Sequence, residues 1–514
     1  MNSSRRSFLL GLAALAAAGC ASRLVSSAPA GRDPFTLGVA SGYPRPDGFV
    51  LWTRLAPEPL APDGGMPPAP VRVIWEVAAD EAFARVVRRG ETVAVPALAH
   101  AVHIEVRGLE PDRWYSYRFR TGEAVSPPGR TRTAPAPDAP FPRLAFALAS
   151  CQHYEHGYYA AYRHMVAEPL DLVVHVGDYI YEYSLAANTV RSHGAGEAVT
   201  LEDYRRRYAL YRLDPALQAA HAAFPWIVTW DDHEVDNDYA NDRSQDLEER
   251  EAFLARRAAA YQAYYEHMPL PAGARPSGPA MRLYTQAAFG RLARFFVLDG
   301  RQYRDPQPCP RPGRGGGATV QECPERLEPG RSMLGKAQER WLTEGFERTR
   351  AQWNVIAQQT MMASMDRRPG DGQAFWTDSW DGYPAARRRL LEALVARRVS
   401  NPVVLSGDLH AFGVSDLKLD FDDPRSPPVA SEFVTTSISS RGFSQRRIEE
   451  ILSDNPHLKL ADGRFRGYTT IELEPQRAVA RLRALRDATN PESAIRTLAE
   501  FVVESGRPGP QRRA

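Results

Sequence analysis

Short apolar runs that end in polar residues recur beyond residue 140, and they constrain the fold more than any other feature of the chain. Long segments of helical pattern separate them. The five runs are Leu144–Ala149, Leu172–Val176, Trp226–Trp230, Phe295–Leu298 and Val403–Leu405. A strand that is covered on both faces is apolar throughout, so this alternation predicts buried strands in an α/β layer fold.

Potential ligands follow each of these predicted strands directly. They are Ser150-Cys151, Gly177-Asp178, Asp231-Asp232-His233, Asp299-Gly300-Arg301 and Gly407-Asp408-Leu409-His410. In open α/β sheets the functional crevice lies beyond the carboxyl ends of the strands. We therefore expect the five clusters to converge on one rim.

Three of the clusters have the chemistry of a two-metal site. One carboxylate can bridge two cations, and Asp178 follows a glycine that lets the chain turn sharply off the strand. Asp408 and His410 are two residues apart on an extended segment, so both side chains can reach one site. Asp232, beside His233, adds a third carboxylate, and three aspartates packed together are costly unless cations neutralise them. Taken singly, each motif could instead be a helix cap or a surface turn.

Residues 35–134 have a different pattern, in which short segments alternate apolar and polar residues between turns rich in Gly, Pro and Asp. The segments are Phe49–Thr53, Val71–Val77, Val102–Val106 and Trp114–Arg120. This pattern is typical of an antiparallel β-sandwich, here of immunoglobulin or fibronectin III type. No catalytic cluster occurs in this segment, so we interpret it as a structural or docking domain.

The first residues resemble an export signal. Arg5-Arg6 precede a short apolar run, which is typical of a twin-arginine leader over residues 1–19. Cys20 stands where a lipoprotein is cleaved and lipidated, and residues 20–34 are a linker; the alternative is an ordinary leader cut near Ala18. We expect an exported protein, in the periplasm or at the cell surface, with a lipid anchor at Cys20.

Composition and cysteine use narrow the class of protein further. The 514 residues are 43% hydrophobic and 25% charged, which excludes a multi-span membrane protein and a mostly disordered chain. A net charge of +2 gives no basic excess that would indicate nucleic-acid binding. Cys309 and Cys323 flank a glycine-rich loop and predict a disulfide in an oxidising compartment, which leaves Cys151 as an odd thiol that needs a role.

The strand-end motifs are together similar to a known family. Ala149-Ser150-Cys151-Gln152, Gly177-Asp178-Tyr179-Ile180-Tyr181-Glu182, Trp230-Asp231-Asp232-His233-Glu234 and Ser406-Gly407-Asp408-Leu409-His410 resemble the PhoD-type alkaline phosphatase/phosphodiesterase family of the calcineurin-like metallophosphoesterase superfamily. The resemblance covers about residues 34 to 500. It implies an α/β (α+β) four-layer metallophosphoesterase sandwich over residues 141–500, after the all-β domain and before a tail at 501–514.

The resemblance also implies the metals and their ligands, namely Fe³⁺ with one or two Ca²⁺. The iron site would consist of Cys151, Asp178, Tyr181 and His410, and the calcium site of Asp178, Asp232 and Asp408. Thiolate, phenolate and carboxylate favour a trivalent ion, whereas an all-oxygen set suits calcium. Spacing alone would allow manganese or zinc. Cys151 could also be an inert buried thiol, and Tyr179 or Tyr183 could replace Tyr181.

Two residues are candidates for catalysis. His233 would face the open side of the metals and protonate the leaving alcohol, unless it is a further ligand or a structural donor. Arg205, in a helical segment, is our candidate for clamping phosphate oxygens, and its alternative is a solvated helix face. Asn237, Asp238 and Asn241 are further candidates for calcium binding.

The sequence therefore predicts an exported, monomeric phosphohydrolase that cleaves phosphate monoesters, diesters or both by attack of a metal-activated hydroxide. The substrate is a small or polymeric phosphate ester. Loops 184–200, 305–331 and 366–384 decide between the two ester classes. The alternative is a non-catalytic, calcium-stabilised binding protein at the cell surface on the same scaffold.

Overall fold

The computed structural model describes residues 31–513. The predicted leader, the lipidation site at Cys20 and most of the linker lie outside this range, so they remain predictions. Among the residues within it, no helix is long and apolar enough to cross a membrane.

Two large sheets form the centre of the molecule. The first has the order β24 (Gln511–Arg512), β23 (Ile495–Glu504), β22 (Arg477–Leu485), β21 (Gly467–Leu473), β9 (Leu144–Ala149), β10 (Leu172–His175), β11 (Pro225–Val228), β1 (Val39–Arg45), β2 (Gly48–Arg54) and β5 (Ala101–Val106). The second has the order β12 (Thr285–Phe289), β13 (Ala293–Val297), β15 (Trp353–Ala357), β17 (Pro402–Ser406), β19 (Pro428–Val434), β18 (Phe412–Lys418) and β20 (Leu458–Asp462). Their facing side chains form one core, in which the rings of Phe146 and Phe295 meet edge to face at 5.3 Å.

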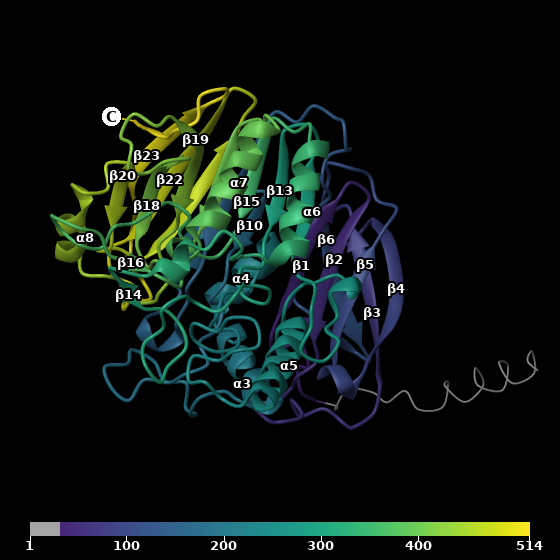
Figure 1. Cartoon of the computed structure of the whole chain (residues 1–514). Coiled ribbons are helices and arrows are strands. Elements are labelled where there is room, and N and C mark those ends of the chain that lie inside the picture. The colour runs from purple at the N-terminus through teal and green to yellow at the C-terminus, as the bar shows by residue number, and fades with distance from the viewer. Residues whose placement is uncertain (1–30, 514) are drawn as a thin grey trace, which may run out of the picture.

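Helices cover the outer face of each sheet. Those on the first sheet are α2 (Ala160–Val166), α3 (Leu201–Arg212), α4 (Pro215–Ala223) and α5 (Arg250–His267). Those on the second are α6 (Gly335–Arg348), α7 (Pro384–Ala396) and α8 (Gln445–Leu452). Figure 1 shows α6 and α7 side by side over β13 and β15. The predicted four-layer α/β sandwich is confirmed.

The five predicted strands of the α/β part correspond to β9, β10, β11, β13 and β17, with ends that differ by at most two residues. β9, β10 and β11 are parallel neighbours in one sheet, and β13, β15 and β17 are parallel neighbours in the other. Parallel neighbours have their carboxyl ends at the same edge, so each sheet presents one row of strand ends. The strand β15 was not predicted.

The N-terminal segment forms the predicted β-sandwich. One of its sheets consists of β4 (Val86–Ala94), β3 (Val71–Ala78), β6 (Trp114–Thr121) and β7 (Ala124–Val125), with β8 (Gly129–Arg132) paired to β6. This sheet packs against β1, β2 and β5, with Leu51, Val73 and Phe119 in the core between them.

The second sheet of this sandwich is not separate from the α/β layers. β1 pairs in parallel with β11, with Ser41 opposite Pro225 and Gly42 opposite Trp226. The ten-stranded sheet therefore runs from the N-terminal sandwich into the α/β part. Figure 1 shows the result, with β3 and β4 at one side of the molecule and β20 and β23 at the other.

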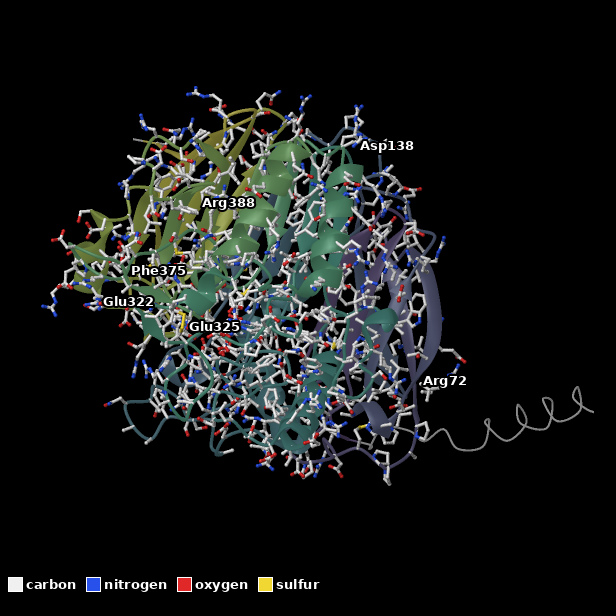
Figure 2. All side chains as sticks on the ribbon, in the orientation of Figure 1. Arg72, Asp138, Glu322, Glu325, Phe375 and Arg388 are labelled. Carbon is white, nitrogen blue, oxygen red and sulfur yellow. A yellow bond between two sulfur atoms is a disulfide. The ribbon has the colours of Figure 1, made fainter. Side chains whose placement is uncertain are left out.

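The segment between β13 and α6 contains the predicted disulfide, which the structure confirms between Cys309 and Cys323. Glu322 and Glu325, labelled in Figure 2, flank Cys323 in the chain. Inside the closed loop, the backbone N–H of Gly317 donates to Asp238 at 2.9 Å. The strand β14 (Thr319–Val320), also inside it, pairs with β16 (Phe375–Trp376). The disulfide thus restrains a loop that contacts residues near the strand ends.

Replacing both disulfide cysteines with serine is expected to destabilise the protein. The bridge joins residues 14 positions apart, and closing a loop of that length stabilises a fold by about 3 kcal/mol. Urea unfolding of the double variant should show a loss of about that size. Reductant should destabilise only the parent protein, and an unchanged unfolding midpoint in the variant would contradict the expectation.

Candidate metal centre

The strand ends present the predicted ligands in a backbone conformation that is uncommon for residues other than glycine. Cys151 lies two residues after the end of β9. Asp178 follows β10, and Asp408 and His410 follow β17. All four have positive φ, at 58°, 56°, 62° and 55° respectively. Strained backbone of this kind concentrates at functional sites, where the surrounding structure holds it in place.

The glycine before each of two aspartates is required by close packing. A Cβ on Gly177, whose φ is +113°, would lie 2.4 Å from the Cβ of Asp231. A Cβ on Gly407 would lie 2.6 Å from the Oγ of Ser150. The repeated Gly-Asp motif therefore reflects two places where neighbouring strand ends approach too closely for any side chain.

The structure brings together the residues that were predicted to bind iron. Ligand atoms of Cys151, Asp178 and His410 all lie within 4.8 Å of one another. The Tyr181 hydroxyl donates to Asp178 Oδ2 at 2.8 Å and lies 3.1 Å from His410 Nε2. The alternative Tyr179 instead pairs with His221 at 2.8 Å, away from this group. Tyr181 is therefore the tyrosine whose hydroxyl contacts Asp178 and His410, whereas Tyr183, the other alternative, lines the cavity over the group.

A second group shares Asp178 with the first. Ligand atoms of Asp178, Asp232 and His233 lie within 4.8 Å of one another, as do those of Asp232, Asp238 and Asp378. One oxygen of Asp178 and one of Asp232, both Oδ1, are buried without a hydrogen-bond partner among residues 31–513. Buried carboxylate oxygens are normally satisfied, so these two are suited to a cation. The buried Asp, His and Cys side chains of this region could thus bind metal ions.

Crowding of the acidic groups shifts their protonation. Burial, together with the charge of Asp232, raises the pKa of Asp408 to about 7. Burial and the nearby Asp178 carboxylate raise the pKa of the Cys151 thiol and of the Tyr181 phenol well above their ordinary values. A bound cation would favour the charged forms of all these groups, because it compensates for both lost hydration and mutual repulsion.

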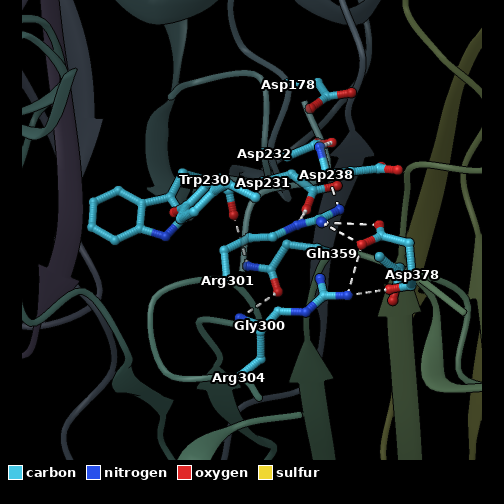
Figure 3. Close-up of polar contacts among 12 residues, drawn as sticks. Asp178, Trp230, Asp231, Asp232, Asp238, Gly300, Arg301, Arg304, Gln359 and Asp378 are labelled. Atoms are coloured by element: carbon cyan, nitrogen blue, oxygen red, sulfur yellow. Dashed lines mark hydrogen bonds and ion pairs between the residues drawn. The ribbon is translucent and has the colours of Figure 1, made fainter. Parts of the chain in front are cut away.

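Arg301 partly neutralises this acidic cluster from below (Figure 3). Its guanidinium is fully buried, donates to Asp231 and to Asp378, and lies 3.5 Å from Asp232 Oδ1. Burial alone would raise the pKa of Asp232, but the charge of Arg301 lowers it. Arg304 donates to Asp378 at 2.7 Å. Asp231 and Asp378 therefore accept hydrogen bonds from arginines, whereas Asp178 and Asp232 each keep one oxygen that accepts none from the described residues.

Glu234 fixes the turn that presents Asp178. Its buried carboxylate accepts hydrogen bonds from the backbone N–H groups of Asp178, Tyr179 and Asp231. Burial and the neighbouring Asp178 raise its pKa to about 8. The sequence motif contained Glu234, but no spacing rule indicated that its partners are three backbone amides on two different strand ends.

His233 is held by a carboxylate from the preceding strand-end motif, Gly177–Glu182. Its Nδ1 lies 2.8 Å from Glu182 Oε2. Burial would lower the pKa of this imidazole, but the charge of Glu182 raises it well above the ordinary value. The predicted catalytic histidine thus has a fixed ring orientation and a partner that favours its protonated form.

A cavity of about 420 Å³ lies over the cluster. The candidate ligands and their neighbours contribute Asp178, Tyr181, Tyr183, Asp232, His233, Asn237, Asp238, Asp408 and His410 to its lining. The lining also includes Met361, Ala363, Met365, Arg367, Trp376, Ser379, Asp381, Leu409 and Phe443. Segment 361–381, which follows β15 and overlaps the predicted loop 366–384, contributes seven of these residues.

Three of the predicted residues do not line this cavity. Cys151 is buried in the group with Asp178 and His410, whereas Arg205 and Asn241 lie away from the ligand groups. Arg205 forms an ion pair through two hydrogen bonds with the buried carboxylate of Glu266, at 2.6 and 2.7 Å, and does not line the cavity. Its assignment as the phosphate clamp is corrected on this ground, because its guanidinium is already occupied. Asn241 likewise is not part of the lining and accepts from Arg257. Asn237 and Asp238 do line it.

The four layers and the strand-end cluster of carboxylates, thiol, phenol and imidazoles define a class of scaffold in which side chains that could bind metal ions lie at a cavity. Residues 146–482 match the PhoD-like phosphatase family, and residues 19–135 match the PhoD-like phosphatase N-terminal domain. The chain belongs to the PhoD-like phosphatase family, as its motifs predicted.

Two relatives show how far the similarity extends. Alkaline phosphatase D of Bacillus subtilis (strain 168) is 49% identical over 484 residues, which are 93% of this chain and 82% of that protein. A solved structure described as "Structure of PhoD" superposes with a TM-score of 0.91 and 48% identity, covering 95% of this chain and 93% of the other. The similarity thus includes both the N-terminal sandwich and the α/β layers.

Replacing Arg301 with methionine is expected to destabilise the fold strongly. The change leaves Asp231 and Asp378 buried without one of their cations, and breaking a buried pair in this way costs about 3–5 kcal/mol. Urea unfolding measures the loss. Arg388→Met, which removes an exposed pair with Glu392, is the matched control and should change little. Equal stability of the two variants would contradict the role given to Arg301.

Proposed function

We propose that the chain is an exported, metal-dependent phosphoric ester hydrolase that acts on a phosphate monoester or diester in the cavity over the strand ends. The observation that carries this proposal is the position of Asp178, which belongs both to the Cys151 group and to the Asp232 group and keeps a free buried oxygen. A carboxylate shared in this way is the central element of a two-metal hydrolase. Family membership supports the same activity.

The two groups of ligands suit different ions. Cys151, Asp178, Tyr181 and His410 offer sulfur, phenol and nitrogen as well as carboxylate, and we assign iron to them. Asp178, Asp232 and Asp408 offer oxygen alone, which suits calcium. Asp238, which lies near Asp232, is the candidate ligand for a second calcium. When bound, such cations polarise the phosphate ester and activate a water molecule as the nucleophile.

In this proposal His233 donates a proton to the leaving alcohol. Glu182 holds its Nδ1, and the side chain lines the cavity, so its other ring nitrogen is free to face the substrate. A protonated imidazole can pass its proton to the ester oxygen as the bond to phosphorus breaks. Glu182 favours that protonated state and prevents the ring from turning.

Export is the second part of the proposal. The twin-arginine motif at Arg5-Arg6 and the cysteine at position 20 support a leader and a lipid anchor. The disulfide fits an oxidising compartment. We place the mature protein in the periplasm or at the cell surface.

Asp232→Ala separates the enzyme from a binding protein that merely uses calcium for stability. Loss of this carboxylate should lower kcat/KM for an aryl phosphate or bis-aryl phosphate by about 10²–10³-fold, since it removes charge stabilisation at the reacting group. Thermal unfolding should change little. Asp246→Ala, at an exposed residue, is the control. Unchanged activity with a large fall in melting temperature would favour the binding protein.

Iron bound by a phenolate and a thiolate should give the protein visible charge-transfer absorption. Tyr181→Phe is expected to remove or shift the phenolate part of this band, while Tyr183→Phe, at a neighbouring tyrosine, should leave it unchanged. An absorption spectrum and a metal analysis of the same samples measure both effects. A colourless, iron-free protein with full activity would refute the assignment of iron to Cys151 and Tyr181.

A further inference from the structure

Arg367 stands out among the residues that line the cavity, because its charged group has neither a hydrogen-bond partner nor an ion-pair partner in the described part of the chain. No hydrogen bond or ion pair of its guanidinium occurs within residues 31–513, and its Nε is buried and unsatisfied. Its backbone is anchored, since its N–H donates to the carbonyl oxygen of Ala374 at 2.7 Å. Loss of hydration lowers the pKa of Arg367. An arginine in this situation is costly unless a ligand supplies the missing acceptor.

The nearest acidic groups are already used. Asp381 accepts hydrogen bonds from Arg387 at 2.7 Å, from the Ser364 hydroxyl at 2.9 Å and from the Met365 N–H at 2.9 Å. Asp408 is assigned to a cation in the proposed function. Neither carboxylate therefore pairs with Arg367, and its charge is available to a molecule in the cavity.

Aromatic rings flank the guanidinium. Its carbon lies 5.2 Å from the ring centre of Trp376 and 5.5 Å from that of Phe443, and both rings line the cavity. Phe443 is 43% exposed, so part of its ring is open to a ligand in the cavity. The cavity lining also includes the apolar side chains of Met361, Met365 and Leu409. A wall of this composition suits an organic group and not a bare phosphate.

The next residue in the chain is also an arginine, but it does not line the cavity. Arg368 is exposed and donates to Gln321 Oε1 at 2.9 Å, outside the cavity. Of the residues that line the cavity, Arg367 is the one arginine. The charges of Asp408 and Asp238 act on it, so it faces the same cavity as the candidate metal ligands, while its direct neighbours are aromatic rings.

We propose that Arg367 is a specificity-determining residue that binds a negatively charged oxygen on the organic part of the phosphate ester, while Trp376 and Phe443 pack against that part. This inference rests on the proposed function, because it assumes that the phosphoryl group occupies the side formed by Asp178, Asp232 and His233. The preferred substrates are then phosphate esters whose alcohol group is itself anionic.

Two aryl phosphate esters that differ only in a ring carboxylate test the inference on the metal-loaded enzyme. In Arg367→Met, kcat/KM for the carboxylated ester should fall about 10- to 100-fold, chiefly through KM, since a hydrogen bond between charged groups is lost. The ester without the carboxylate should change less than about threefold. Arg367→Lys should restore part of the difference, and Arg368→Met should behave as the parent protein.

Equal losses for the two esters, or no loss for either, would overturn the inference. A non-hydrolysable carboxyaryl phosphonate provides a second measurement, because its binding is followed by tryptophan fluorescence without turnover. Binding that depends on Arg367 in a protein that hydrolyses neither ester would support the inference and refute the proposed function. Hydrolysis of both esters with no effect of the Arg367 variants would support the proposed function and overturn the inference.

Discussion

The rest of the site depends on the repulsion among carboxylates that the strand ends bring together. Three of these carboxylates line the cavity, and two more accept hydrogen bonds from Arg301 beside it. They are Asp178, Asp232 and Asp408 in the lining, and Asp231 and Asp378 at Arg301. Arg301, with no exposed surface, offsets part of this charge from the protein side. The carboxylate oxygens of Asp178 and Asp232 that accept no hydrogen bond from the described residues indicate that bound cations offset the remaining negative charge. This division explains why some of the aspartates are structural and others are available for chemistry.

The fold holds these groups through backbone constraints and not through long side chains. Two glycines allow neighbouring strand ends to approach closely, four residues adopt positive φ, and Glu234 ties three backbone amides together. Because the ten-stranded sheet continues into the N-terminal sandwich through β1 and β11, the strand that carries Asp232 is supported on both sides. The N-terminal segment thus contributes to the rigidity of the site without lining it.

Apolar runs and alternating segments were sufficient to predict the α/β layers, the N-terminal sandwich and the convergence of the strand-end clusters. These features depend on local pattern and on the rule that parallel strands end together. The grouping of Cys151, Asp178, Tyr181 and His410 was implied by the family resemblance of the strand-end motifs, and the disulfide by the two cysteines that flank a glycine-rich loop. Arg205 was misjudged, because a helical arginine motif does not reveal that Glu266 lies opposite it. Arg367 and Asp378 were missed for a similar reason, since they lie in a loop whose path depends on tertiary contacts. The shared sheet could not be foreseen, because pairing of β1 with β11 joins segments far apart in the chain.

Anomalous X-ray diffraction at the iron edge, on crystals of the protein as purified, tests the central claim most directly. The account predicts one iron peak within about 2.5 Å of the Cys151 sulfur, with the Asp178 carboxylate in the same coordination shell. Absence of a peak there, or iron bound at another place in the chain, would contradict it.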